Sequence, residues 1–308
     1  MLISRRRTLA LGSIVALSPG HLHAQPSGPV SAELPITRCD ACAQWNVPQR
    51  PFRVHGNTYY VGTGGLTALL VTSPSGHVLI DGALPESAPL IAASIRALGF
   101  RLEEVQVLLN SHAHYDHAGG LAALQRASGA AVLLHPWSAK VLRLGTSPTD
   151  DPQYGLRLPF PGVRAQRELK DGEVVRVGTL ALTAHFTGGH TPGGTTWTWR
   201  SCEDTRCWDM VYADSQSPIS DDAFRFSRNT RYPTVLKDFA QAQHLFDMIA
   251  CDVVLTPHPS ASEIFERHLR REAGDSAAFR DQSACREYAT LSRGRLAERL
   301  AKESARQP

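Results

Sequence analysis

The sequence predicts an α/β protein of the α+β kind, with at least two β-sheets covered by helices. Its 308 residues are 42% hydrophobic and 20% charged, which is the composition of a globular protein that can bury a large core. Short β-like runs and amphipathic helical stretches follow one another without strict alternation. This mixed order favours stacked layers over a simple doubly wound sheet.

The first half of the chain is rich in predicted strands. Residues 25–57 contain many Pro, Gly and Gln and are expected to wrap the surface. Apolar runs bounded by turn residues then predict strands at 58–61, 67–71, 77–81, 105–109 and 131–135. Apolar positions on one face predict a helix over 87–98, which Gly99 ends. Residues 119–127 are also expected to be helical.

The second half combines further strands with two longer helices. Residues 144–164 hold four prolines and three glycines and predict a long loop, of the kind that often serves as a lid. Trp45, with Tyr154 and Phe160 of this loop, is either a wall of a substrate groove or an ordinary packing aromatic. Strands are predicted at 173–177, 180–186, 195–199, 208–213 and 253–256. Helices are predicted over 234–250 and 276–303.

Residues 1–24 have the features of an export signal. Arg5, Arg6 and Arg7 precede an apolar stretch that is too short to span a bilayer, and Ala24 offers a cleavage edge. The paired arginines resemble a twin-arginine signal, and a general secretory signal is the alternative. We therefore expect a periplasmic protein in which residues 25–308 form a single domain. No later run of 18 apolar residues occurs, so stable membrane insertion is not expected.

The charge balance argues against a nucleic-acid partner. The whole chain carries 32 Lys and Arg against 29 Asp and Glu, a net charge of +3. Removal of the three leader arginines leaves 29 against 29, a net charge of zero. A nucleic-acid-binding protein would carry a strongly basic surface. We expect a monomer that acts on a small molecule.

Six cysteines, all outside the leader, are expected to form disulfides in an exported chain. Fifteen pairings are possible. Cys202 and Cys207 flank a predicted hairpin tip and are expected to pair. Cys251 and Cys285 lie near two different helices, which suits a cross-link. Cys39 and Cys42 form a lone C-x-x-C, for which a local disulfide is preferred to a redox role.

The strongest functional signal is the segment from His112 to His117, which directly follows the buried strand 105–109. His112 and His114, two apart in an extended segment, point the same way and can bind one metal. Asp116 and His117 can face a second metal close by. Imidazole nitrogens with one carboxylate are a ligand set that zinc favours. A solvated polar loop is a poor alternative, because an apolar strand leads straight into these residues.

Two further histidines complete two sets of three ligands. His190 lies in a glycine-rich segment, where the backbone can approach a site closely, and His258 follows the strand 253–256. Three protein ligands with an open position are typical of a catalytic zinc site. Two such zinc ions can share one hydroxide. The remaining histidines, His185 among them, lack ligand-rich surroundings.

These motifs resemble the metallo-β-lactamase superfamily, and most closely its subclass B3. The resemblance rests on the segments that begin at His112, at Gly188 and at Tyr212, on Thr256-Pro257-His258-Pro259, and on the Cys251/Cys285 pair. Ile80-Asp81-Gly82 also resembles the early aspartate motif of the family. The resemblance implies a four-layer αβ/βα sandwich with two central β-sheets flanked by helices, and a metal site at one edge between the sheets.

The resemblance also implies roles for individual residues. His112, His114 and His190 would hold the first of two Zn²⁺ ions, and Asp116, His117 and His258 the second. Asp116 would also orient the attacking hydroxide, as the catalytic residue. Ser215 and Ser217 would bind the carboxylate of a β-lactam, or else merely end a strand. Gln216 departs from the apolar residue expected between them. Ser215 would stand where other superfamily members carry a metal ligand, unless Asp214 bridges both metals.

The implied activity is zinc-dependent hydrolysis of the β-lactam amide bond of penicillins, cephalosporins and carbapenems, which would confer antibiotic resistance. No serine-nucleophile motif of the Ser-x-x-Lys or Gly-x-Ser-x-Gly type occurs in the chain. Another hydrolase of the superfamily, such as a lactonase or a thioester hydrolase, is the main alternative. Two further alternatives are an exported zinc-binding protein without catalysis and a redox iron site. An iron site would leave the second set of three ligands unused.

Overall fold

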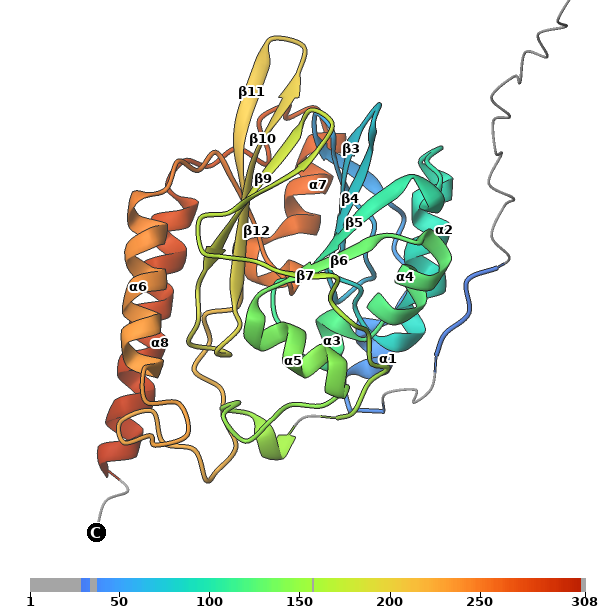
Figure 1. Cartoon of the computed structure of the whole chain (residues 1–308). Coiled ribbons are helices and arrows are strands. Elements are labelled where there is room, and N and C mark those ends of the chain that lie inside the picture. The colour runs from blue at the N-terminus through green and yellow to red at the C-terminus, as the bar shows by residue number, and fades with distance from the viewer. Residues whose placement is uncertain (1–28, 34–37, 157, 306–308) are drawn as a thin grey trace, which may run out of the picture.

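The computed structural model describes residues 29–33, 38–156 and 158–305. Two sheets form the centre of the molecule (Figure 1). The seven-stranded sheet has the order β1 to β7: β1 Phe52–His55, β2 Thr58–Tyr60, β3 Leu69–Ser73, β4 Gly76–Ile80, β5 Val105–Leu109, β6 Ala131–Leu134 and β7 Arg167–Glu168. The five-stranded sheet has the order β12-β11-β10-β9-β8: β8 Val174–Val177, β9 Leu180–Phe186, β10 Thr195–Glu203, β11 Arg206–Tyr212 and β12 Val253–Leu255.

Each sheet contains both antiparallel and parallel pairs of neighbouring strands. Strands β1 to β4 pair antiparallel, whereas β4 to β7 pair parallel. In the second sheet β8 to β11 are antiparallel and β12 lies parallel to β11. Parallel neighbours need crossover segments, and in the first sheet these contain helices α2 (Ala88–Ala97), α4 (Leu121–Ser128) and α5 (Pro136–Leu144). As a result β4 and β5 end at one edge of one sheet, and β11 and β12 end at one edge of the other.

Helices cover the outer faces of both sheets (Figure 1). The α-helices are α1 Cys42–Trp45, α2 Ala88–Ala97, α3 Tyr115–Ala118, α4 Leu121–Ser128, α5 Pro136–Leu144, α6 Val235–Met248, α7 Ile264–Glu272 and α8 Ala284–Ala305. Short 3₁₀ turns are η1 Pro85–Ser87, η2 Leu102–Glu104, η3 Tyr154–Leu156 and η4 Pro259–Ser262. Helices α2 and α4 lie on the larger sheet, and α6 packs beside α8 on the smaller one.

The side-chain alternation of the strands builds the layers. In β4, Leu79 belongs to the core beneath the helices, whereas Val78 and Ile80 belong to the core between the sheets. In β11, Val211 faces α6 and α8, and Met210 faces the other sheet. Successive residues of a strand point to opposite faces, so each sheet buries both of its sides. The predicted four-layer αβ/βα sandwich is therefore confirmed.

The predicted strands are found with small shifts of their ends, whereas several elements were missed, among them the short α1, α3 and β7. Strand β1 lies in the segment expected only to wrap the surface. Helix α5 begins with Pro136 after His135, whose side chain accepts a hydrogen bond from the backbone N–H of Trp137, and Gly145 ends it with a φ of 68°. Helix α7 buries only Ile264 and Arg267, so its apolar signal is weak.

The last helix begins later than predicted, at Ala284 rather than at residue 276. Asp281 is the physical reason. Its carboxylate accepts hydrogen bonds from the backbone N–H and hydroxyl of Ser283, at 3.0 and 2.7 Å. Such a local turn competes with a helical conformation and starts the helix after it.

The cysteines pair as Cys39–Cys42, Cys202–Cys207 and Cys251–Cys285. No free cysteine occurs among the described residues. Cys202 and Cys207 are cross-strand partners in the β10–β11 hairpin, and Cys285 joins α8 to the segment before β12. The predicted signal peptide, residues 1–24, lies outside the described residues. In the described part of the chain, no helix combines the length and hydropathy needed to cross a membrane.

Candidate metal centre

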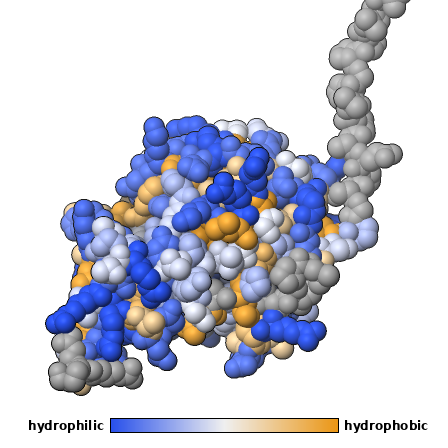
Figure 2. Space-filling view, turned by 60° about the horizontal axis from the view of Figure 1, so that its bottom comes forward, coloured by the Kyte–Doolittle hydropathy of each residue, from blue (hydrophilic) through white to orange (hydrophobic). Residues whose placement is uncertain are grey.

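The chemistry-bearing residues meet at the edge where strands of both sheets end. The segment from Asn110 to His117 follows β5, and Asp214 comes two residues after the end of β11. His258 comes three residues after the end of β12, and His190 lies on the connection between β9 and β10. In Figure 2 the molecule is turned toward this edge, and hydrophobic side chains reach the surface there between hydrophilic ones. The two sheets thus bring four distant segments together.

Six of these side chains form two groups of three. The first group is His112, His114 and His190, and the second is Asp116, His117 and His258. Within each group, the atoms that could bind a metal all lie within 4.8 Å of one another. The His112 and His117 rings are 4.4 Å apart between centroids, so the two groups adjoin. The arrangement offers two neighbouring sites with three ligands each.

Each histidine of the first group has an outer partner on one ring nitrogen. Nδ1 of His112 lies 2.8 Å from Oδ1 of Asp214, and Nε2 of His114 lies 3.0 Å from Oδ2 of Asp151. Nδ1 of His190 lies 2.8 Å from the carbonyl oxygen of Ser217. Carboxylates and carbonyls only accept, so these ring nitrogens carry the hydrogen. The other nitrogen of each ring is then a lone-pair donor that faces the group.

This pattern matches what a metal requires. Histidine ligands of metals almost always donate their second ring N–H to a carboxylate or a carbonyl, which fixes the tautomer and the ring orientation. Nε2 of His112 is buried and has no hydrogen-bond partner in the structure. Burial lowers the pKa of His112 well below its ordinary value, and the neighbouring His117 and His114 lower it further. A neutral imidazole is the form that binds a metal.

The second group is built around Asp116. Its Oδ2 lies 3.3 Å from Nε2 of His117 and 3.4 Å from Nε2 of His258. Burial alone would raise the pKa of Asp116, but the contacts with His117 and His258 outweigh it and hold that pKa well below the ordinary value. Nδ1 of His258 lies 3.3 Å from the carbonyl oxygen of Gly65. Asp116 is thus ionised at neutral pH.

Asp214 belongs to neither group of candidate ligands. Its side chain is fully buried, and its Oδ1 forms the hydrogen bond with Nδ1 of His112. Burial raises the pKa of Asp214 well above its ordinary value. The hydroxyl of Tyr288, on α8, donates to the Asp214 carbonyl at 2.9 Å. This geometry gives Asp214 an orienting role and offers no support for Asp214 as a bridge between two metals.

A second buried carboxylate, Asp81, ties the strand ends together. It follows β4 with a φ of 65°, a conformation uncommon outside glycine. Its oxygens accept from the Ser111 N–H and hydroxyl, the Asn110 amide and the Tyr212 hydroxyl, each at 2.7 Å. Asp81 therefore connects β4, the histidine segment after β5 and the end of β11.

The long loop reaches the site through two residues that sequence reasoning missed. Asp151 is the partner of His114, and Nε2 of Gln153 lies 3.2 Å from Nε2 of His190. Both side chains are buried. The sequence signal that could have pointed to them was the presence of an aspartate and a glutamine in a loop that was predicted to serve as a lid. Trp45 lies beside His258 with ring centroids 5.2 Å apart, and Tyr154 is exposed, whereas Phe160 is buried in the core beneath the helices.

Ser215 and Ser217 follow β11 on the rim of the site. Ser217 contributes its carbonyl to His190, and its hydroxyl also lies 3.2 Å from Nδ1 of that ring. Ser215 is half-buried, and its carbonyl accepts from the Gln216 amide. The Gln216 amide also donates to the carbonyl of Thr187, which holds the segment against β9. The polar residue that departed from the family pattern thus has a structural partner.

Comparison with known proteins agrees with this geometry. The family model described as the metallo-β-lactamase superfamily matches residues 61–275, more than half of the chain. The chain belongs to the metallo-β-lactamase superfamily. The solved structure named Rm3 metallo-β-lactamase is 50% identical, with a TM-score of 0.85, and the match covers 87% of this chain and 100% of that one. MEM-A1, a subclass B3 metallo-β-lactamase from a soil metagenome library, is 49% identical with a TM-score of 0.83, over 85% of this chain and 100% of that one.

These likenesses confirm two predictions about this metallo-β-lactamase superfamily member. The chain is an enzyme, and its resemblance to subclass B3 holds along nearly the whole length of both solved structures. More distant relatives match in part. A hydroxyacylglutathione hydrolase from Anaeromyxobacter dehalogenans is 32% identical over 154 residues, which are 49% of this chain and 46% of that protein. The chain therefore spans less than half the length of that curated relative.

Proposed function

We propose that the protein hydrolyses the β-lactam amide bond of penicillins, cephalosporins and carbapenems, and thereby confers antibiotic resistance. The observation that carries the proposal is the pair of adjoining ligand groups, three histidines beside an aspartate and two histidines. The full-length likeness to metallo-β-lactamases supports the same reaction. Hydrolysis adds the hydroxyl of water to the ring carbonyl carbon and its proton to the ring nitrogen, and the C–N bond breaks.

The ligand groups suit two Zn²⁺ ions per chain. Imidazole nitrogen with a carboxylate oxygen is a donor set typical of zinc, and three protein ligands leave a position open. His112, His114 and His190 would hold one ion, and Asp116, His117 and His258 the other. Bound there, zinc would lower the pKa of a water molecule and polarise a carbonyl oxygen. We infer both occupancy and metal identity from the donor set.

The chain's own residues would then orient the reaction. Asp116 is ionised and belongs to the second ligand group, so its carboxylate can fix the direction of the attacking hydroxyl. Asp214 and Asp151 hold His112 and His114 in one tautomer and one orientation. Preorganised groups of this kind need no rearrangement during the reaction. Ser215 and Ser217, on the rim, would bind the substrate carboxylate, with Ser215 the less constrained of the two.

The first experiment measures the turnover of a penicillin and of a carbapenem through the loss of their absorbance. We expect hydrolysis that a chelator abolishes and that added Zn²⁺ restores. Asp116→Asn should lower kcat by more than about 100-fold, since changes to the surroundings of a metal site already cost 10- to 100-fold. Asp204→Asn, at the exposed tip of the β10–β11 hairpin, is the matched control and should leave turnover unchanged.

A thioester hydrolase is the second candidate, because the partial relative is a hydroxyacylglutathione hydrolase. The same preparation is therefore assayed with a glutathione thioester. Turnover of the thioester without turnover of any β-lactam, by protein shown to contain two zinc ions, would overturn the proposed function. The orienting role of Asp214 favours the β-lactam reaction, because the bridging aspartate of other superfamily hydrolases is not reproduced in either ligand group.

We further propose that the enzyme is exported to the periplasm. The support is the arginine-led apolar segment within residues 1–24 and the three cysteine pairs of the structure. Replacing Arg5 and Arg6 by Lys should leave precursor in the cytoplasm if the twin-arginine route is used. Fractionation of cells checks this, and unchanged export would point to the general secretory route instead.

A further inference from the structure

The first short helix of the chain lies against the second ligand group. Helix α1 spans only Cys42–Trp45, and its last residue places an indole ring beside the imidazole of His258, with ring centroids 5.2 Å apart. The two rings come from segments near opposite ends of the described chain. Trp45 offers no metal ligand, so its contact with a candidate ligand points to a different role.

The turn between β2 and β3 connects this helix to His258. Nδ1 of His258 lies 3.3 Å from the carbonyl oxygen of Gly65, and its Nε2 lies 3.4 Å from Oδ2 of Asp116. A carbonyl that accepts from the second ring nitrogen of a metal-binding histidine fixes the tautomer and the orientation of the ring. The position of the Gly65 carbonyl therefore decides where Nε2 of His258 points.

Trp45 holds this turn through both its backbone and its side chain. Its carbonyl accepts hydrogen bonds from the backbone N–H of Gly65 at 3.0 Å and from the Thr63 hydroxyl at 2.7 Å. Next to these, the carbonyl of Val47 accepts from the backbone N–H of Gly64 at 2.8 Å. A Cβ at position 65 would lie 2.5 Å from Cδ1 of Trp45, so only glycine fits there without a shift of the helix. The turn thus lies directly on Trp45.

Two anchors hold α1 in place. A helix of a single turn is not stable by itself, so its position depends on its connections to the rest of the fold. The Cys39–Cys42 disulfide closes the turn at its start, and the Cys42 side chain is buried in the core beneath the helices. After the helix, the Asn46 side chain accepts from the Ser87 hydroxyl at 2.6 Å. The C-x-x-C pair, which has no part in the proposed reaction, thus fixes the helix that carries Trp45.

We propose that Trp45 is a positioning residue for the second metal position, and that the Cys39–Cys42 disulfide holds it in place. Trp45 supports the Gly65 carbonyl, and its ring limits the outward rotation of His258, whose side chain is 33% exposed. The inference rests on the proposed function in one respect, which is that the second ligand group holds Zn²⁺. Its test counts bound zinc and does not depend on turnover of a β-lactam.

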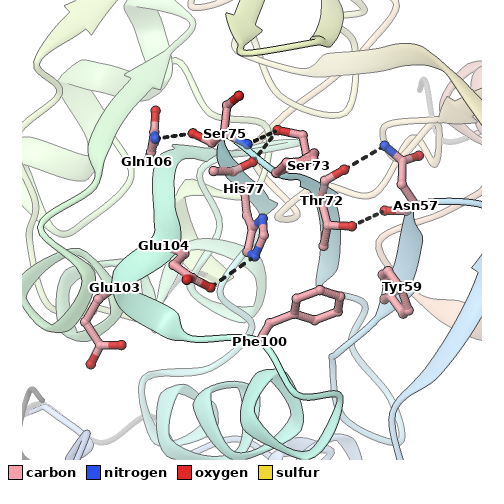
Figure 3. Close-up of a pocket in the computed structure, with 12 residues that line it drawn as sticks. Asn57, Tyr59, Thr72, Ser73, Ser75, His77, Phe100, Glu103, Glu104 and Gln106 are labelled. Carbon is pink, nitrogen blue, oxygen red and sulfur yellow. Dashed lines mark hydrogen bonds and ion pairs between the residues drawn. The ribbon is translucent and has the colours of Figure 1, made fainter.

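Another aromatic ring beside a histidine, at the other end of the larger sheet, provides a matched control. Figure 3 shows Phe100 next to His77, and their ring centroids are 5.1 Å apart, against 5.2 Å for Trp45 and His258. Both aromatic side chains are half-buried. His77 lies at the start of β4 and belongs to neither ligand group. Loss of either aromatic ring removes a comparable contact, but only one of these contacts involves a candidate ligand.

Zinc retention under chelation tests the proposal. Protein loaded with Zn²⁺ is exposed to a series of chelator concentrations, and native mass spectrometry counts the ions per chain. We expect Trp45→Ala to lose its first ion at about tenfold lower chelator concentration than the wild type, the lower end of the effect of changing an outer partner of a metal ligand. Trp45→Phe, which keeps a ring beside His258, should restore most of the retention. Phe100→Ala should match the wild type.

The disulfide is tested in the same way. Cys39→Ser/Cys42→Ser should also lose its first ion more readily than the wild type, but by less than Trp45→Ala, because the indole ring is still present. Cys202→Ser/Cys207→Ser removes the other short-range disulfide, at the hairpin tip, and should leave zinc retention unchanged. A single unfolding transition in calorimetry shows that each variant is folded.

A milder variant covers the case in which Trp45→Ala does not fold. Thr63→Val keeps the shape of a buried side chain but removes the hydroxyl that donates to the Trp45 carbonyl, so zinc loss should shift in the same direction. His258→Ala, which lacks one ligand of the second group, provides the reference for a chain that holds a single ion. The ion that Trp45→Ala retains should leave at the same chelator concentration as the ion of His258→Ala.

Three results would overturn the proposal. One is zinc retention by Trp45→Ala and Thr63→Val equal to that of the wild type, and a raised KM for β-lactams would then make Trp45 only a wall of the substrate groove. Another is equal zinc loss from Phe100→Ala and Trp45→Ala. The third is a wild-type chain that never holds a second Zn²⁺, which would also overturn the two-ion assignment. The expected zinc losses without any β-lactam turnover would overturn the proposed function and leave this inference standing.

Discussion

His112 donates the hydrogen of Nδ1 to Oδ1 of Asp214 across 2.8 Å, and both side chains are almost completely buried. The two residues lie 102 positions apart, one after each of two strands in different sheets. The hydrogen bond fixes which nitrogen of His112 faces the ligand group. Asp214 thus acts on the proposed metal through His112, as a positioning residue.

Asp214→Asn tests this relationship. The amide keeps the shape but is a weaker hydrogen-bond acceptor than the carboxyl group, so His112 is held less firmly and is a weaker ligand. We expect metal affinity to fall by about 10- to 100-fold, measured as zinc retained at a set chelator concentration. Asp204→Asn is the control, since Asp204 is exposed and has a φ of 54°, which Asn also tolerates. Full zinc retention by Asp214→Asn would contradict the orienting role.

Metal removal should lower stability as well as activity. The two ligand groups draw on segments that follow β5, β9 and β12, so a bound ion connects both sheets. A ligand that binds only the folded state stabilises it, by about 4 kcal/mol at a thousand times its Kd. We expect a chelator to lower Tm by several degrees and Zn²⁺ to restore it, measured by calorimetry. An unchanged Tm with metal shown to be absent would contradict this coupling.

Glu303 predicts a pH dependence of stability. Its carboxylate accepts from the backbone N–H groups of Phe226 and Ser227, at 3.0 and 2.9 Å, and from Nε of Arg299 at 2.9 Å. Burial alone would raise the pKa of Glu303, but these hydrogen bonds, with that from the Ser227 hydroxyl, hold it below the ordinary value. A lowered folded-state pKa stabilises the protein above the unfolded value and loses that contribution as pH falls through the folded one.

Glu303→Gln should therefore reduce the free energy of unfolding at pH 7 by about 1.5–3 kcal/mol. Below about pH 4 the difference from the wild type should shrink, because the wild-type carboxylate takes up its proton there. Urea unfolding at both pH values measures this. Glu298→Gln, exposed on the same helix, should show no difference at either pH. A constant difference between wild type and Glu303→Gln would contradict the assigned sign.

The Cys251–Cys285 pair closes a segment with a sequence separation of 34 residues. On the chain-entropy model such a loop contributes about 4 kcal/mol to stability. The double variant Cys251→Ser/Cys285→Ser should lose about this free energy of unfolding, and a reductant should not destabilise it further through this bond. Mass mapping of the oxidised protein checks the pairing itself. Equal stability of the variant and the oxidised wild type would contradict the prediction.

Much of this architecture could be predicted from the sequence. The segment 105–109, apolar except for the exposed Gln106, forms β5 with the predicted bounds, because four apolar residues in five give a strand a strong local signal. The histidine segment after it indicated metal ligands, because few other arrangements explain so many histidines in so few residues. Helix α7 was missed because it buries little, and the helix 276–303 was drawn too long because Asp281 forms a local turn.

The partners of the histidines could not be predicted in the same way. Asp151 meets His114 across 37 residues, and the carbonyl of Ser217 meets His190 across 27. Nothing in the local sequence of either partner specifies such a contact, which depends on how the long loop and the end of β11 lie over the edge of the sheets. The alternative of a bridging Asp214 was open for the same reason, and the contact of Asp214 with His112 removes its support.

The six candidate ligands are unequally shielded from water. The side chain of His258 is 33% exposed, whereas those of His112, His114 and His117 are 1% exposed. Departure of an ion begins when a ligand swings away and water takes its place, and an exposed ring can do so with little disturbance of the core. The two positions should therefore differ in exchange kinetics. An ion held by Asp116, His117 and His258 should leave first, so that limited chelation yields a population with one ion per chain.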